Sequence, residues 1–150
     1  VLQTINDVAF GHGVRSYAKN GMVKEWSQGL VDALVDAYNP RLFLANHVAG
    51  GAVKRVGETD TAFPHRNAEI MLVFASGWMD PAQDEQMIAE TRELYKAVEP
   101  YMGGYYDNID FDGAEVAGNY GPAYSRLTEI KGRYDPGNLF RMNSNIKPAA

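Results

Sequence analysis

The first alternating stretch of the chain is a short segment near its start. Residues 14–19 alternate in a way that predicts a strand, with Arg15, Tyr17 and Lys19 together on one face. Two interpretations are open for this face. It lines a polar site, or it is simply solvated.

Two further stretches have the apolar pattern of strands. Residues 42–47 form one, and the Gly50-Gly51 pair permits a turn or bulge before the strand continues over residues 52–56. Residues 68–77 are almost unbroken in apolar character. We therefore expect this last strand to be covered on both faces and to lie in the centre of its sheet.

Three segments have the period of amphipathic helices. The first covers residues 23–38 and ends before a proline. The second begins with Asp80 as N-cap and runs over residues 81–98. The third begins at Pro122 and is stopped by the Asp135-Pro136 pair, which also begins a tail rich in asparagine. This order suggests a helix that positions a tail.

Together these segments predict an α+β fold, an antiparallel β-sheet with helices packed on one face. The length of 150 residues corresponds to one domain, residues 1–150. A loop over residues 58–67 precedes the central strand. The tail over residues 138–148 is polar enough to bind something and apolar enough to be buried; the alternative is a C-terminal strand whose polar groups are already satisfied.

Residues 101–112 alternate and predict one more strand. It presents Tyr106, Asn108 and Asp110 on one face, which is a candidate surface for handling protons. A phenol has a reference pKa near 10, so it needs a positive or hydrogen-bonding neighbour to act as a base. The alternative is an ordinary edge strand.

The composition is that of a soluble globular domain, with 45% hydrophobic and 22% charged residues. A net charge of −5 argues against a nucleic-acid surface. No apolar run approaches the roughly 18 residues of a membrane span. Without cysteine the chain has no disulfide or thiol nucleophile, and its compartment stays open, with a soluble, cytoplasmic location favoured.

No metal site is expected, because the acids Asp80, Asp84 and Glu85 are usual at the positive end of a helix. The three histidines lack the serine or acid partner motif of a hydrolase. The chain begins at Val1 rather than at a methionine, which hints at a processed or excised piece.

An ordered series of short motifs resembles the C-terminal part of the berberine bridge enzyme-like flavoproteins. The strongest is YDPGNLF at 134–140 followed by NSNIKP at 143–148. The others are GGAV at 50–53, TAFPHR at 61–66, WMDP at 78–81 and GGYYDN at 103–108. The family's C-terminal motif then covers residues 106–148.

The resemblance implies a substrate domain whose sheet roofs the flavin of an FAD-dependent oxidoreductase. Tyr106 and Asn108 match the first two positions of the family's Tyr-x-Asn-aromatic segment, and Ile109 stands where many members have a tyrosine base. The base is then Tyr106, Asp110 or a residue of another domain. We expect these three residues, Tyr106, Asn108 and Asp110, to be catalytic.

The resemblance also implies cofactor and substrate contacts. Expected next to the isoalloxazine of FAD are Asn138, Phe140, Asn143 and Ser144, the last of which often is glutamine in the family. Candidate substrate contacts are Tyr17, His47 and Arg66. From the residues alone, His47 belongs either to a satisfied polar pair with Asn46 or to a site wall.

The expected partners are a small organic substrate, such as an alcohol, sugar or secondary metabolite, and an FAD-binding domain of the same parent protein that this chain lacks. Electrons usually go to dioxygen in the family, and this chain alone is expected to be inactive; a homo-oligomer is possible. A second hypothesis is a free-standing, non-catalytic binding or assembly module that has lost the flavin domain.

Overall fold

A three-stranded antiparallel sheet forms the centre of the computed structural model, which describes residues 11, 13–109, 116–142 and 144–149. The strands are β1 (Arg15–Val23), β2 (Phe43–Val48) and β3 (Ile70–Trp78), in the order β1-β3-β2. β3 is the central strand, as its unbroken apolar pattern predicts. Its register runs from Arg15 opposite Trp78 to Val23 opposite Ile70, and β2 pairs from Phe43 opposite Ala75 to Val48 opposite Ile70.

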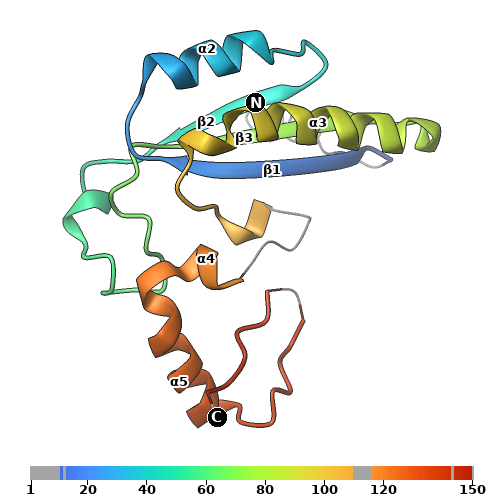
Figure 1. Ribbon diagram of the computed structural model, residues 1–150. Coiled ribbons are helices and arrows are strands. Elements are labelled where there is room, and N and C mark those ends of the chain that lie inside the picture. Colours follow the sequence, from blue (N-terminus) through green and yellow to red (C-terminus); the bar gives the residue numbers. More distant parts are fainter. Residues whose placement is uncertain (1–10, 12, 110–115, 143, 150) are drawn as a thin grey trace.

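Two helices lie on one face of this sheet, so the predicted α+β class is confirmed (Figure 1). α2 covers Gln28–Asp36 and begins at Ser27, whose hydroxyl accepts from the Leu30 amide at 3.2 Å. α3 covers Asp84–Val98 and follows a 3₁₀ turn, η2 (Pro81–Gln83). Asp80 caps that turn as predicted, because its carboxylate accepts from the Ala82 amide at 3.0 Å.

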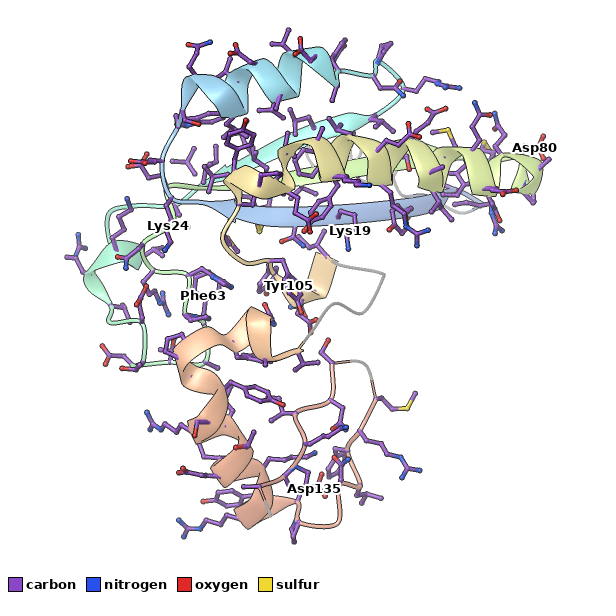
Figure 2. All side chains as sticks on the ribbon, viewed as in Figure 1. Lys19, Lys24, Phe63, Asp80, Tyr105 and Asp135 are labelled. Atoms are coloured by element: carbon purple, nitrogen blue, oxygen red, sulfur yellow. The ribbon has the colours of Figure 1, made fainter. Side chains whose placement is uncertain are left out.

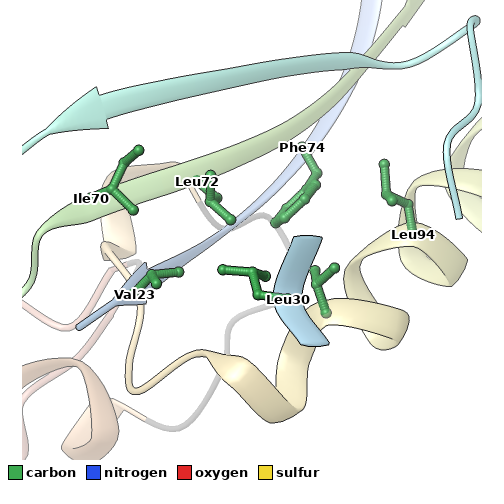
Figure 3. Close-up of a cluster of buried hydrophobic side chains, with 7 residues drawn as sticks. Val23, Leu30, Ile70, Leu72, Phe74 and Leu94 are labelled. Atoms are coloured by element: carbon green, nitrogen blue, oxygen red, sulfur yellow. The ribbon is translucent and has the colours of Figure 1, made fainter. Parts of the chain in front are cut away.

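The core between the sheet and these helices consists of aliphatic and aromatic side chains from every layer (Figure 3). Burying each of them contributes about 1.5–3 kcal/mol. They are Val23, Leu30, Ile70, Leu72, Phe74, Leu94 and Val98.

The first predicted helix begins later than its apolar pattern indicates. Val23, the first residue assigned to it, instead ends β1, and residues 24–27 lead from β1 to α2, with Trp26 50% exposed. Val23 is fully buried because it pairs with Ile70 at the end of the sheet. The sheet therefore extends at the expense of the helix.

The polar face of β1 lies under α3: Tyr17 and Lys19 are buried there, and only Arg15 at its end is exposed. Arg15 forms a bidentate ion pair with Asp84, with both distances at 2.5 Å. The Tyr17 hydroxyl accepts from Arg92 at 3.0 Å. Polar side chains here connect strand to helix.

Two predicted strand segments are wrong. Residues 52–56 do not continue a strand: Gly51 has a φ of 51°, and the chain turns into a 3₁₀ segment, η1 (Val53–Arg55). Residues 101–109 form two 3₁₀ turns, η3 (Glu99–Tyr101) and η4 (Asp107–Ile109), with an irregular link between them. Gly104 breaks the predicted alternation there, with a φ of 116°.

The C-terminal elements extend away from the sheet on the side of β1 (Figure 1). They are α4 (Val116–Tyr120), a 3₁₀ turn η5 (Gly121–Ala123) and α5 (Tyr124–Tyr134). The third predicted helix is thus confirmed, and the tail folds back beside α5 without forming a strand in its described residues. Among the helices of the described residues, none has the length and apolar character needed to cross a membrane.

Candidate functional site

The face of the sheet away from α2 and α3 carries a second, smaller apolar cluster. Met22, Met71 and Val73 point to this face and pack with Ala68. Three side chains from outside the sheet cover them, namely Phe63, Tyr106 and Ile109. Tyr106 therefore reaches the face of the sheet that the helices leave open.

Tyr106 and Asn108 form a hydrogen-bonded pair. The Asn108 amide donates to the Tyr106 hydroxyl oxygen at 2.8 Å, and Asn108 is exposed while Tyr106 is half-buried. A phenol that accepts from an amide keeps its own O–H to donate to another group. The two residues lie together although the strand predicted for them is a turn. Asp110, the third candidate of this group, lies outside the described residues.

Ile109 points into the second apolar cluster rather than toward solvent. The position where family members often have a tyrosine is therefore used for packing in this chain.

The TAFPHR segment supports the ring of Tyr106. Phe63 meets Tyr106 edge to face, with ring centroids 6.2 Å apart and planes at 73°. The Arg66 guanidinium lies 5.0 Å from the Phe63 ring centroid and donates to the Phe63 carbonyl at 3.1 Å. Arg66 also donates to the Thr61 hydroxyl at 2.6 Å. These contacts brace the loop, and they place Arg66 near Tyr106 through Phe63.

His65 also contacts Phe63 edge to face, with ring centroids 5.5 Å apart. Its Nε2 atom is buried and makes no hydrogen bond to the described residues. Burial lowers the pKa of His65, and the carbonyls of Tyr105 and Asn119 oppose this effect to a smaller extent. No functional role was predicted for this histidine from the sequence.

A pocket of about 260 Å³ opens beside His65. It lies between the loop before β3 and the segment that begins at Gly103, and it extends to the start of the last helical region. Figure 2 places Phe63 and Tyr105 between the sheet and α4. The residues that line this pocket include Met22, Lys24, Glu58, His65 and Pro122.

The other two predicted substrate contacts lie apart from this group. His47 is exposed on β2, and it pairs with Met71, so it shares the open face of the sheet. Tyr17 lies on the helix-covered face and is 5% exposed. Arg66 and Tyr106 thus both contact Phe63, whereas Tyr17 lies on the other side of the sheet.

The tail is anchored by Asp135 at the end of α5 (Figure 2). Its carboxylate accepts from the amides of Leu139 at 2.8 Å and Phe140 at 3.0 Å. Lys131 donates to the same carboxylate and to the Phe140 carbonyl, both at 2.5 Å. The hydrogen bond from Lys131, with smaller contributions from the two amides, lowers the pKa of Asp135. The helix therefore positions the tail, as its sequence suggests.

Two asparagines of this tail have buried side-chain oxygens without a hydrogen-bond partner in the described residues, Asn138 and Asn145. Asn138 adopts a left-handed φ of 49°. Ser144 is half-buried, and Asn143 lies outside the described residues. Asn145, one of three asparagines in the tail, was not among the residues predicted to contact FAD.

These features fit the isoalloxazine ring of FAD. A buried amide oxygen without a donor costs about 1–3 kcal/mol, so a ligand N–H group would stabilise it. The ring is also flat and largely apolar, and the tail exposes apolar side chains: Leu139 is 77% exposed, Phe140 78% and Met142 84%. Among the described residues no group of three or more His, Asp or Glu side chains is arranged to hold a metal ion.

Comparison with known proteins shows what this chain is similar to. Residues 105–147 match the family described as berberine and berberine like. The chain is 30% identical, over 98% of its length, to an FAD-linked oxidoreductase of Dictyostelium discoideum, of which it covers 34%. It is 29% identical, over 87% of its length, to berberine bridge enzyme-like 6 of Arabidopsis thaliana, of which it covers 26%.

A solved structure gives the same result. CrmK, a flavoenzyme involved in the shunt product recycling mechanism in caerulomycin biosynthesis, superposes with a TM-score of 0.79 and 30% identity, over 95% of this chain and 34% of CrmK. The chain thus spans about a quarter to a third of the length of these relatives. The chain therefore carries a berberine bridge enzyme-like domain, and the relatives that it matches are berberine bridge enzyme-like proteins and FAD-linked oxidoreductases.

Proposed function

We propose that this chain is the substrate-binding, C-terminal part of an FAD-dependent oxidoreductase, and that Tyr106 handles the proton released when the substrate is oxidised. The observation that carries the proposal is the 2.8 Å hydrogen bond from Asn108 to the Tyr106 hydroxyl, on the open face of the sheet. A fixed phenol with an oriented oxygen is suited to proton transfer.

The tail and the Tyr106 turn have separate roles in this proposal. Bound FAD would supply a two-electron acceptor for the substrate. Asn138 and Asn145 would donate or accept hydrogen bonds at its polar edge, and Phe140 would pack against its ring. Asn143 and Ser144, the other expected contacts, belong to the same segment of the tail.

Near the substrate, Tyr106 would hold or accept a proton at its hydroxyl oxygen, and Asn108 would keep that oxygen oriented. Asp110 is the alternative base. Arg66 and His47 are candidates to bind the substrate from the open side of the sheet, because each lies on or next to this face. Tyr17 is not included, since α3 covers it.

The proposal extends to partners. An FAD-binding domain of the same parent protein would pack on the tail, since about two thirds to three quarters of the length of the relatives lies outside the matched region. The substrate would be a small alcohol, sugar or secondary metabolite, and dioxygen the final acceptor. This chain by itself would have no turnover.

The experiment is a stopped-flow measurement of flavin reduction in the complete protein. Tyr106→Phe removes only the hydroxyl oxygen, and we expect it to slow flavin reduction by about 10²–10⁴-fold while the flavin stays bound. Tyr38→Phe is the matched control, because Tyr38 is 70% exposed at the end of α2.

An unchanged rate of flavin reduction in Tyr106→Phe would exclude Tyr106 from proton transfer. A complete protein that purifies without any flavin absorption would reject the oxidoreductase altogether, and the non-catalytic binding module would then replace it.

A further inference from the structure

The backbone of Tyr106 is held by the side chain of one buried residue of β1. We propose that Asn20 is a positioning residue that sets the place of both Tyr106 and Asn108, an inference that rests on the function proposed above for Tyr106. Asn20 is fully buried and lies on the open face of the sheet, opposite Val73.

Asn20 makes two hydrogen bonds with the same residue. Its side-chain oxygen accepts from the Tyr106 amide at 2.6 Å, and its side-chain nitrogen donates to the Tyr106 carbonyl at 2.8 Å. A carboxamide has the same donor and acceptor as a peptide group. Asn20 therefore pairs with Tyr106 as a residue of a neighbouring strand would.

The position of Asn20 on β1 explains why its side chain, rather than its backbone, pairs with Tyr106. Two residues further along, Met22 pairs through its own backbone: its amide donates to the Gly104 carbonyl, and its carbonyl accepts from the Gly103 amide, both at 2.8 Å. After Gly104 the chain leaves strand geometry. The longer reach of the Asn20 side chain extends the pairing to Tyr106.

The same carbonyl of Tyr106 also starts the turn that carries Asn108. The Ile109 amide donates to it at 3.2 Å, which closes η4. Loss of the Asn20 amide would release the first residue of this turn as well as the backbone that carries the phenol. Phe63 supports only the ring, so the backbone depends on Asn20.

The test compares Asn20→Ala with Thr91→Val in the complete flavoprotein. Thr91 is also fully buried, and its hydroxyl donates to the Met87 carbonyl at 2.9 Å on the helix-covered side of the sheet. Both changes remove a buried polar contact, but only Asn20 contacts Tyr106. Asn20→Asp, which keeps the shape and the acceptor oxygen, replaces Asn20→Ala where the alanine variant does not fold.

We expect the Asn20 variant to keep its flavin and to reduce it about tenfold to a hundredfold more slowly, because small displacements of a reacting group have effects of this size. Thr91→Val should leave the rate unchanged. In a Tyr106→Phe background the Asn20 change should cause no further loss, since the group that it positions is already absent. A residue with a merely structural role would slow both backgrounds equally.

Amide hydrogen exchange gives a readout that needs no turnover. Exchange at Tyr106 and Ile109 should become at least about tenfold faster in the Asn20 variant, while the amides of β3 stay protected. Unchanged exchange, or equal losses of rate in both backgrounds, would overturn the inference. Faster exchange together with a normal rate in Tyr106→Phe would support Asn20 as the residue that holds the turn and would reject the function proposed for Tyr106.

Discussion

Gly104 and His65 fit together because the glycine has no side chain. A Cβ atom built on Gly104 would lie 2.5 Å from the His65 Cε1 atom, well inside contact distance. Gly104 also has a φ of 116°, which other residues adopt at a cost of about 1–3 kcal/mol. His65 is thereby held against the backbone two residues before Tyr106, and its ring is half-buried with the Nε2 atom inaccessible to water.

This placement makes His65 a source of pH dependence. Because burial lowers its pKa below the ordinary value of 6.5, the unfolded chain binds the proton more readily than the folded chain. The contribution of the neutral His65 side chain to the free energy of unfolding is therefore fully present above about pH 6.5. It is lost as the pH falls through the lower pKa of the folded state. We expect the melting temperature of the complete protein to fall over this range, and to fall less in His65→Gln.

The comparison needs melting curves between about pH 5 and pH 8 for three proteins. His47→Gln is the control, because His47 is exposed on β2. Parallel curves for the unmodified protein and His65→Gln would show that His65 has no such effect.

At the scale of elements, the end of α5 and the tail form one unit through Asp135. We expect Asp135→Ala to leave α5 in place and to speed hydrogen exchange at Leu139 and Phe140 by about tenfold or more, since both amides donate to this carboxylate. If the tail binds FAD, the flavin should also dissociate more easily from the variant. Exchange measured by mass spectrometry, with Asp36→Ala on the exposed side of α2 as control, tests the first effect.

The same anchor should depend on pH in the unmodified protein. The lowered pKa of Asp135 means that its contribution is present above the ordinary value of 3.8 and is lost as the pH falls through the folded-state pKa. Equal protection of Leu139 in Asp135→Ala and in the unmodified protein would contradict the anchor.

The elements that could be predicted from the sequence are those whose signals are local. The unbroken apolar run of β3 and the cap at Asp80 specify their structures within a few residues. The segment after Gly103 could not be predicted in this way, because its alternation is that of a strand and its actual partner, Asn20, is more than eighty residues earlier in the chain. Nor does alternation show that α3 would cover Tyr17.

The candidate site likewise has residues that could be predicted from the sequence and residues that could not. The family resemblance locates Tyr106 and Asn108, and the structure shows that they are hydrogen-bonded. Asn20 and Asn145 could not be found by pattern, since a buried amide has no period and no neighbouring signal. Their positions follow only from which polar atoms the fold satisfies and which it leaves unpaired.

At the scale of the whole molecule, the described part of the chain exposes many large apolar side chains. Besides the tail, β2 at the edge of the sheet exposes Phe43 at 61% and Val48 at 82%. Exposed apolar groups that lie next to each other usually mark an interface. Since the relatives are about three to four times as long as the matched region, we expect the rest of the parent protein to cover part of this surface.

Hydroxyl-radical footprinting tests this expectation at Met142, because methionine is readily oxidised when exposed. Met142 is 84% exposed in this chain, and Met79, between β3 and η2, is 71% exposed. We expect Met142 to be oxidised several-fold more slowly in the complete, flavin-loaded protein than in the complete protein after its flavin is removed, whereas Met79 should be oxidised equally in both. Equal protection of Met142 in the two forms, with both oxidised slowly, would mean that protein alone covers the tail and that the flavin does not contact it. Rapid oxidation of Met142 in both forms would leave the tail at the surface, and the proposed roles of Asn138 and Asn145 would then fail together.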